Sequence, residues 1–175
     1  MAVCGGAMFS VRETASARPP QVGRTRFIAV DGRAGSGKST LAGLMARELG
    51  AEIVHTDDFA SWDNPVDWHG DLIDSIFLPI ERGADSLDYM PSKWWENHHP
   101  QPVVGQPVTA VMILEGVSAL RREFRRYLTV GIFVDTPREV CFERGLQRDL
   151  ATGNSLETLT ALWEGWQQEE ECYFR

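Results

Sequence analysis

Residues 26–40 read RFIAVDGRAGSGKST, and this stretch decides the fold. Its first residues are apolar and partly β-branched, which predicts a buried parallel strand that stops at Gly32. From Lys38 onward, the apolar residues within 41–49 recur at helical spacing, and Gly50 is suited to end that helix in a left-handed conformation. We therefore expect a strand, a glycine-rich loop and a helix, in this order.

The loop between this strand and helix matches the pattern GxxxxGK[ST] of a P-loop. In such a loop the backbone N–H groups surround a phosphate, the lysine reaches the outer phosphates of ATP, and the hydroxyl of Ser39 can bind Mg²⁺. The residues predicted to bind the nucleotide are Gly32, Arg33, Ala34, Gly35, Ser36, Gly37, Lys38, Ser39 and Thr40. The alternative is a glycine-rich turn that binds nothing. A dinucleotide-binding GxGxxG loop is rejected because Thr40 stands where that pattern needs glycine.

The rest of the chain alternates between predicted strands and helices. Apolar runs predict strands at 51–55, 108–116 and 129–136, and helical periodicity predicts helices at 72–82, 118–128, 137–149 and 156–174. This alternation predicts an α/β fold in which helices flank both faces of a parallel sheet, the three-layer α/β/α arrangement of P-loop NTPases. We expect 1–24 to be a flexible leader, 25–175 to form the kinase domain, and 83–107 to be irregular.

Acidic residues follow two of the predicted strands, at the sheet edge where the loop also lies. Glu115 ends an apolar strand, as the magnesium-binding carboxylate of P-loop proteins does, so it is the second predicted metal residue beside Ser39. Asp57 and Asp58 end the strand at 51–55, and one of them can orient an acceptor hydroxyl. Adjacent side chains leave a strand on opposite sides, so the two do not share this role. Solvated or turn-forming carboxylates are the alternative readings.

Arg144 and Arg148 lie four residues apart on the predicted helix 137–149 and therefore share one face. They precede the turn ATGNS, so we predict that they act as a small lid that offsets the charge of the transferring phosphoryl group. Ion pairs of a surface helix with Glu143 and Asp149 are the alternative.

Composition narrows the range of partners. The 175 residues include 17 basic and 25 acidic side chains, a formal net charge of −8, with no long basic block, so a small-molecule substrate is favoured over nucleic acid. Three widely spaced cysteines predict neither a disulfide framework nor a zinc site. No long apolar run or signal-like start is present, so we expect a cytoplasmic protein without a membrane partner. The oligomeric state stays open, and a homo-oligomer is one possibility.

Five segments resemble the uridine kinase-like family of P-loop kinases, within the nucleoside monophosphate kinase-like fold. They are IAVDGRAGSGKST, HTDDF, WDNPVDW, ILEGVSAL and FVDTPREVCFERGLQRD, which cover most of residues 26–149. The resemblance implies that Asp57 is the catalytic base and that Asp63 binds the ribose hydroxyls. It also implies that aromatic residues enclose a pyrimidine, here Phe59, Trp62 and Tyr89.

The sequence also departs from the family at several positions. Ala60 replaces a tyrosine, and Gly145 stands beside Arg144 where relatives have adjacent arginines. Relatives usually continue beyond the position of Arg175, which implies either a compact member or a truncated chain.

The resemblance and the loop together predict an ATP-dependent, Mg²⁺-dependent kinase acting on the 5′-hydroxyl of uridine or cytidine. One alternative is a nucleoside monophosphate kinase of the cytidylate kinase type. Another is a kinase for a non-nucleoside metabolite such as pantothenate, which the missing tyrosine favours. A catalytically silent ATP-binding module is a further alternative. The choice between ATP and GTP is open.

Overall fold

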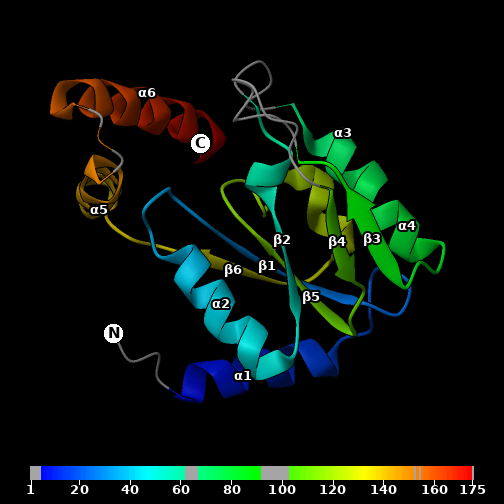
Figure 1. Cartoon of the computed structure of the whole chain (residues 1–175). Helices are drawn as coiled ribbons and strands as arrows, with labels where there is room; N and C mark the ends of the chain where they lie inside the picture. Colours follow the sequence, from blue (N-terminus) through cyan, green and yellow to red (C-terminus); the bar gives the residue numbers. More distant parts are fainter. Residues whose placement is uncertain (1–4, 62–66, 92–102, 152, 154, 175) are drawn as a thin grey trace.

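The computed structural model describes residues 5–61, 67–91, 103–151, 153 and 155–174, and a four-stranded parallel sheet lies at its centre (Figure 1). The strand order is β2–β5–β1–β6. The strand bounds are Arg26–Gly32 for β1, Glu52–His55 for β2, Val111–Glu115 for β5 and Leu128–Val134 for β6. All three strand pairs are parallel, so the carboxyl ends of the strands meet at one edge. The four strands predicted from the sequence are confirmed.

The central strands are buried on both faces, which explains their nearly continuous apolar sequence. In β1, Phe27 and Ala29 face one core cluster, whereas Ile28 and Val30 face the other. Successive side chains of a strand point to opposite faces, so this alternation needs a cover of helices on each side. The predicted three-layer α/β/α arrangement is confirmed.

Helices α1 (Gly5–Ala17) and α2 (Lys38–Leu49) cover the first face (Figure 1). Helix α2 contributes the buried residues Ala42 and Met45 to the core, and α1 contributes the buried Ala15. A helix therefore lies within the segment that we expected to be a flexible leader. The domain boundary after residue 24 stays a prediction.

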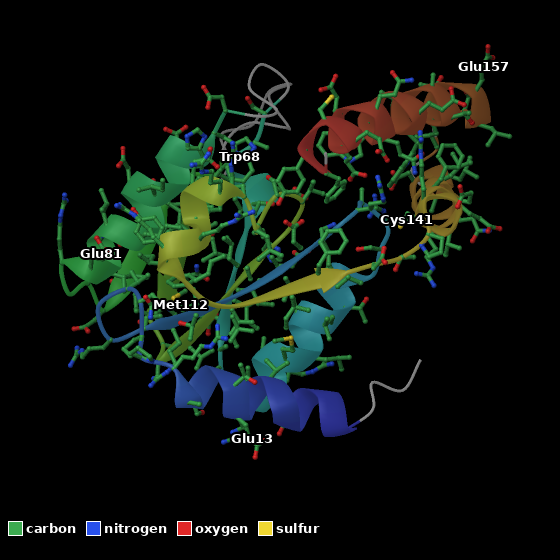
Figure 2. The ribbon with its side chains drawn as sticks, turned by 180° about the vertical axis from the view of Figure 1, so that it is seen from behind. Glu13, Trp68, Glu81, Met112, Cys141 and Glu157 are labelled. Atoms are coloured by element: carbon green, nitrogen blue, oxygen red, sulfur yellow. The ribbon has the colours of Figure 1, made fainter. Side chains whose placement is uncertain are left out.

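The second face is covered by a helical segment and a short 3₁₀ helix. The segment runs through α3 (His69–Leu72), the π-helical turn η2 (Ile73–Phe77) and α4 (Leu78–Glu81), as predicted for 72–82. Figure 2 shows the molecule from behind, with Met112 at the sheet and Glu81 on the outer side of α4. Only η3 (Arg122–Tyr127) forms within the predicted helix at 118–128, and it is a 3₁₀ helix.

Aromatic rings join these helices to the sheet. The ring of Phe77 packs edge-on against Phe27 at 4.9 Å between centroids, stacks on Tyr127 at 4.2 Å and meets Phe124 at 5.7 Å. The two aromatic residues of η3, Phe124 and Tyr127, are therefore core anchors, which explains why a short 3₁₀ helix suffices there.

The segment at 83–107, predicted to be irregular, contains an antiparallel pair of strands. These are β3 (Ser86–Tyr89) and β4 (Val104–Pro107), paired from Ser86 with Pro107 to Tyr89 with Val104. Leu87 and Tyr89 are buried, while Ser86 and Asp88 are exposed. Four alternating residues are too few to stand out among prolines and glycines, and their partner strand lies more than ten residues away in the sequence.

Beyond β6, α5 (Arg138–Leu150) and α6 (Leu156–Phe174) form where the sequence predicts helices. They pack on each other. Gly145 allows the close approach, because a Cβ there would overlap the ring of Trp163. None of the helices within the described residues is long and apolar enough to span a membrane.

Leu72→Ala is expected to lower the free energy of unfolding by about 2–5 kcal/mol, because Leu72, the last residue of α3, is 0 % exposed and belongs to the core cluster on the second face of the sheet. Chemical denaturation of the full chain measures this change. Leu162→Ala is the matched control, since Leu162 is 50 % exposed and should cost less than about 1 kcal/mol. Equal losses in the two variants would contradict the assigned core.

Candidate functional site

The P-loop connects β1 to α2 and depends on glycines with positive φ. Gly35 has φ +80° and Gly37 has φ +97°, a region that side-chain-bearing residues rarely adopt. Gly35 also lies against the carbonyl group of Cys141 at the start of α5, where a Cβ would overlap that group. The loop therefore requires glycine at this position both for its backbone angles and for space.

Several polar groups of this loop lie in a setting that suits an anion. Lys38 is buried, and its Nζ donates a hydrogen bond to the Arg33 carbonyl at 3.4 Å. Arg33 Nη1 and Ser36 Oγ are buried and have no hydrogen-bond partner within the described part of the chain. The first backbone N–H groups of α2 also point out of the helix, which begins its own bonds with Leu41 N–H to the Gly37 carbonyl at 3.1 Å. These donors fit the phosphates of a nucleotide.

The carboxylate of Glu115 is the centre of the second half of the site. Ser39 Oγ donates a hydrogen bond to its Oε1 at 2.9 Å, and His55 Nδ1 lies 2.7 Å from its Oε2. Burial raises the pKa of Glu115, but the bonds from His55 and Ser39 and the charge of Lys38 outweigh burial, so the pKa lies below its usual value. The bond to Glu115 raises the pKa of His55. An ionised carboxylate beside a serine hydroxyl is a donor set that suits Mg²⁺. The magnesium role of Ser39 and Glu115 stays a prediction.

Strand register explains why these groups meet. His55, the last residue of β2, pairs with Glu115, the last residue of β5, and Glu115 pairs with Val30 near the end of β1. Three parallel strands therefore end side by side next to the P-loop. His55 was not singled out from the sequence, although its position at a predicted strand end, like that of Glu115, is a signal that could have identified it.

Asp57 and Asp58 lie in the 3₁₀ turn η1 (Thr56–Asp58) directly after β2, and their surroundings differ. Asp57 is open to solvent but surrounded by protein groups, and this crowding raises its pKa, while the charge of Lys38 opposes the rise. Asp58 instead accepts a hydrogen bond from Tyr89 Oη at 2.9 Å. Asp57 is thus the acid in electrostatic range of Lys38 and Glu115.

The aromatic residues expected at the substrate site lie partly within the core. Phe59 and Tyr89 are both buried, and their rings stack on each other at 5.2 Å with an interplanar angle of 21°. A base could stack between them only if the pair separated. Trp62 and Asp63, the other predicted substrate residues, lie outside the described residues.

Arg144 and Arg148 are exposed on α5, as their spacing suggests. Arg148 forms two hydrogen bonds to Asp149, at 2.7 and 3.2 Å, which is one of the ion pairs considered from the sequence. Its pKa is raised mainly by Asp149 and more weakly by Asp57. Arg148 is therefore within electrostatic range of Asp57. A lid role for both arginines stays a prediction.

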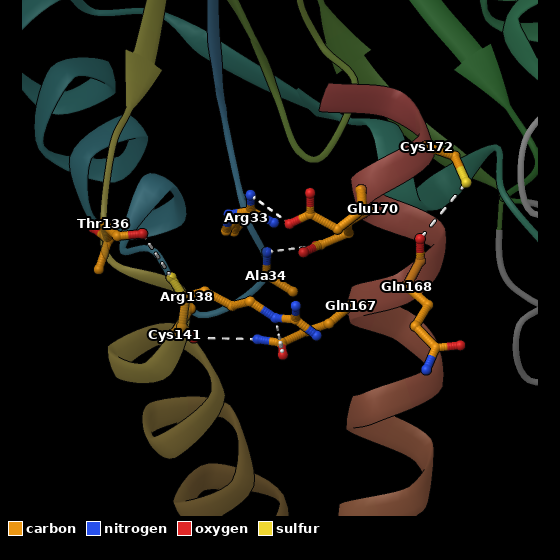
Figure 3. Close-up of polar contacts among 10 residues, drawn as sticks. Arg33, Ala34, Thr136, Arg138, Cys141, Gln167, Gln168, Glu170 and Cys172 are labelled. Carbon is orange, nitrogen blue, oxygen red and sulfur yellow. Dashed lines mark hydrogen bonds and ion pairs between the residues drawn. The ribbon is translucent and has the colours of Figure 1, made fainter. Parts of the chain in front are cut away.

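The end of α6 also reaches the P-loop, a contact that the sequence did not indicate (Figure 3). Glu170 Oε1 accepts a hydrogen bond from the Ala34 N–H at 2.7 Å. Tyr173 Oη donates to Asp31 Oδ2 at 2.6 Å, just before the loop. The run of glutamates at 169–171 near the end of α6 is typical of a solvent-exposed helix face. No sequence signal therefore distinguishes Glu170 from its neighbours.

Comparison with known proteins identifies the family. The profile of the Phosphoribulokinase / Uridine kinase family matches residues 92–173. A uridine kinase from Histophilus somni is 30% identical in an alignment of 156 positions that covers 76% of this chain and 73% of that protein. The chain belongs to the uridine kinase family. A uridine kinase from Schizosaccharomyces pombe, 31% identical over 150 residues, covers 73% of this chain and 32% of its own length.

Two solved structures share the fold of this family member. A candidate fructose transport system kinase from Silicibacter sp. TM1040 superposes with a TM-score of 0.69 and 21% identity, covering 89% of this chain and 85% of its own. A candidate uridine kinase from Bacillus stearothermophilus gives a TM-score of 0.58 and 19% identity, with coverage of 83% and 90%. The central sheet and its helices are thus a fold found in other kinases.

Gly35→Ala is expected to lower the free energy of unfolding by about 1–3 kcal/mol, because the new Cβ meets a positive φ and the Cys141 carbonyl. Thermal or chemical denaturation measures the loss. Gly43→Ala is the control: Gly43 lies inside α2 with no atom near a Cβ, so that variant should gain up to about 1 kcal/mol. A Gly35→Ala variant as stable as the parent chain would contradict the loop geometry.

Proposed function

We propose that this chain transfers the γ-phosphoryl group of ATP, with Mg²⁺, to a hydroxyl group of a small molecule, and that the acceptor is the 5′-hydroxyl of uridine or cytidine. One observation carries the proposal. A buried lysine, a serine–glutamate pair and an aspartate of raised pKa lie together at the carboxyl edge of one parallel sheet. The uridine kinases related to this chain support the nucleoside acceptor.

In this proposal the loop residues 32–40 and the Lys38 ammonium group bind the β- and γ-phosphates, which the unpartnered Ser36 Oγ and Arg33 Nη1 support. Ser39 and Glu115 would hold Mg²⁺, which supplies positive charge that offsets the charge on the phosphates. The low pKa of Glu115 keeps its carboxylate ionised and ready for a cation.

Asp57 has the role of base. The acceptor oxygen forms a bond to the γ-phosphorus, the bond from that phosphorus to the bridging oxygen breaks, ADP leaves, and the hydroxyl proton passes to the Asp57 carboxylate. The raised pKa makes Asp57 a better proton acceptor than an ordinary aspartate. Arg148, and Arg144 one turn before it, would offset the charge of the transferring group.

A smaller alcohol without an aromatic base is the second candidate acceptor. The closed stack of Phe59 on Tyr89 favours it, because neither ring offers a free face in this structure. The side chain of Ala60, buried in the same core cluster, has no polar group to offer a nucleoside. A panel of uridine, cytidine, their monophosphates and pantothenate, assayed for acceptor-dependent ADP release, distinguishes the candidates.

Asp57→Asn is expected to lower kcat by about 10²–10⁴-fold while nucleotide affinity stays close to that of the parent chain, because the amide cannot accept the proton. In the parent chain the rate should fall as the pH drops through the raised pKa of Asp57, since only the ionised form is active, and the variant should lack this acidic limb. ADP release across a pH series measures both effects.

Asp58→Asn is the matched control, because the Asp58 carboxylate accepts a hydrogen bond from Tyr89 Oη. It should keep the rate at neutral pH and an acidic limb, moved slightly to lower pH because the charge of Asp58 contributes to the raised pKa of Asp57. Transfer by Asp57→Asn at the parental rate would eliminate Asp57 as the base.

A further inference from the structure

The C-terminal turns of α6 place a buried carboxylate on the P-loop. Glu170 is only 3 % exposed, and its Oε1 accepts hydrogen bonds from the Ala34 N–H at 2.7 Å and from Trp166 Nε1 at 3.0 Å. Figure 3 shows Glu170 reaching from α6 towards Ala34. Ala34 is the third residue of the GxxxxGKS loop, so an acidic side chain of the protein occupies an amide of a loop built to bind anions.

Further contacts tie the same turns of α6 to the start of the loop. Glu171 Oε1 forms an ion pair with Arg33 at 2.8 Å, and the Arg33 guanidinium lies 4.8 Å above the Phe174 ring. Tyr173 Oη bonds to Asp31 at 2.6 Å. Residues 31–34 are therefore held by α6 from one side. This set of contacts fixes the position of Glu170 on the loop, so that position does not depend on the rotamer of one side chain.

The contact leaves polar atoms without partners. Glu170 Oε2 and Arg33 Nη1 are buried, and neither has a hydrogen-bond partner among the residues that the structure describes. A buried carboxylate oxygen and a buried guanidinium nitrogen without partners are costly. The Glu170 contact thus leaves some of the buried polar groups of the site unsatisfied, which points to a ligand that rearranges them.

Charge adds a second argument. Burial raises the pKa of Glu170, and the Ala34 N–H and the charge of Lys38 oppose that rise, so the carboxylate lies within electrostatic range of the loop lysine. A triphosphate brings several negative charges to the same lysine and the same loop. In its ionised form Glu170 brings a negative charge to the same site, and like charges in a site of low polarity repel each other, so the carboxylate and the triphosphate compete.

We propose that Glu170 is a further residue of the phosphate site: its carboxylate holds the Ala34 amide while the loop is empty, and the triphosphate releases it together with the end of α6. The inference rests on the proposed binding of ATP by the loop. Glu170 is a positioning residue, because it acts on the loop and takes no part in the transfer. Its charge sets how tightly the loop binds nucleotide.

The test is calorimetric titration of the full chain with a non-hydrolysable ATP analogue. Glu170→Gln keeps an oxygen that can accept from Ala34 and Trp166 but removes the competing charge, so it should bind the analogue at least about fivefold more tightly than the parent chain. Glu169→Gln is the matched control, because it removes the same charge from an exposed neighbour on the same helix and should change the affinity less than about twofold.

Hydrogen exchange of the parent chain provides a second readout that needs no variant. Nucleotide should increase the exchange of backbone amides at 167–174, because the end of α6 loses its contacts with the loop. Equal affinities for Glu170→Gln and Glu169→Gln, weaker binding by Glu170→Gln, or greater protection of 167–174 would each overturn the inference. A parent chain that binds no nucleotide would instead overturn the proposed function.

Discussion

The site depends on the Glu115 carboxylate, held between the Ser39 hydroxyl at 2.9 Å and the His55 ring at 2.7 Å. This contact joins the end of β2, the end of β5 and the first turn of α2. It exists because the parallel strands are in a register that brings His55 and Glu115 side by side. A shift of one residue in that register would turn Glu115 away from Ser39 and separate the phosphate loop from the acid opposite it.

The remaining groups are arranged around this contact according to their charge. Lys38 and the first N–H groups of α2 supply positive potential, Asp57 adds an acid whose pKa is raised by crowding, and Arg148 approaches from α5. The chain as a whole carries a net charge of −8, so an anionic nucleotide would be attracted only by this local concentration of donors. The Glu170 carboxylate also acts on this potential, because its negative charge offsets part of the positive potential at the loop.

The sequence was informative where local rules act over a few residues. The glycine loop, the four strands of the main sheet and the strand-end acid Glu115 were all predictable, because each depends on a short pattern and on the rule that parallel strands end at one edge. The hairpin of β3 and β4 was missed because each strand has only four residues. Glu170 was missed because its role comes from a contact across 136 positions, which no local pattern of charges encodes.

The most direct test of the account compares the binding of a non-hydrolysable ATP analogue with and without Mg²⁺, in the parent chain and in Glu115→Gln. The account predicts that Mg²⁺ tightens binding by the parent chain about tenfold or more, and that the variant loses this gain but keeps its Mg²⁺-free affinity. An equal gain from Mg²⁺ in both proteins, or no binding by the parent chain, would contradict it.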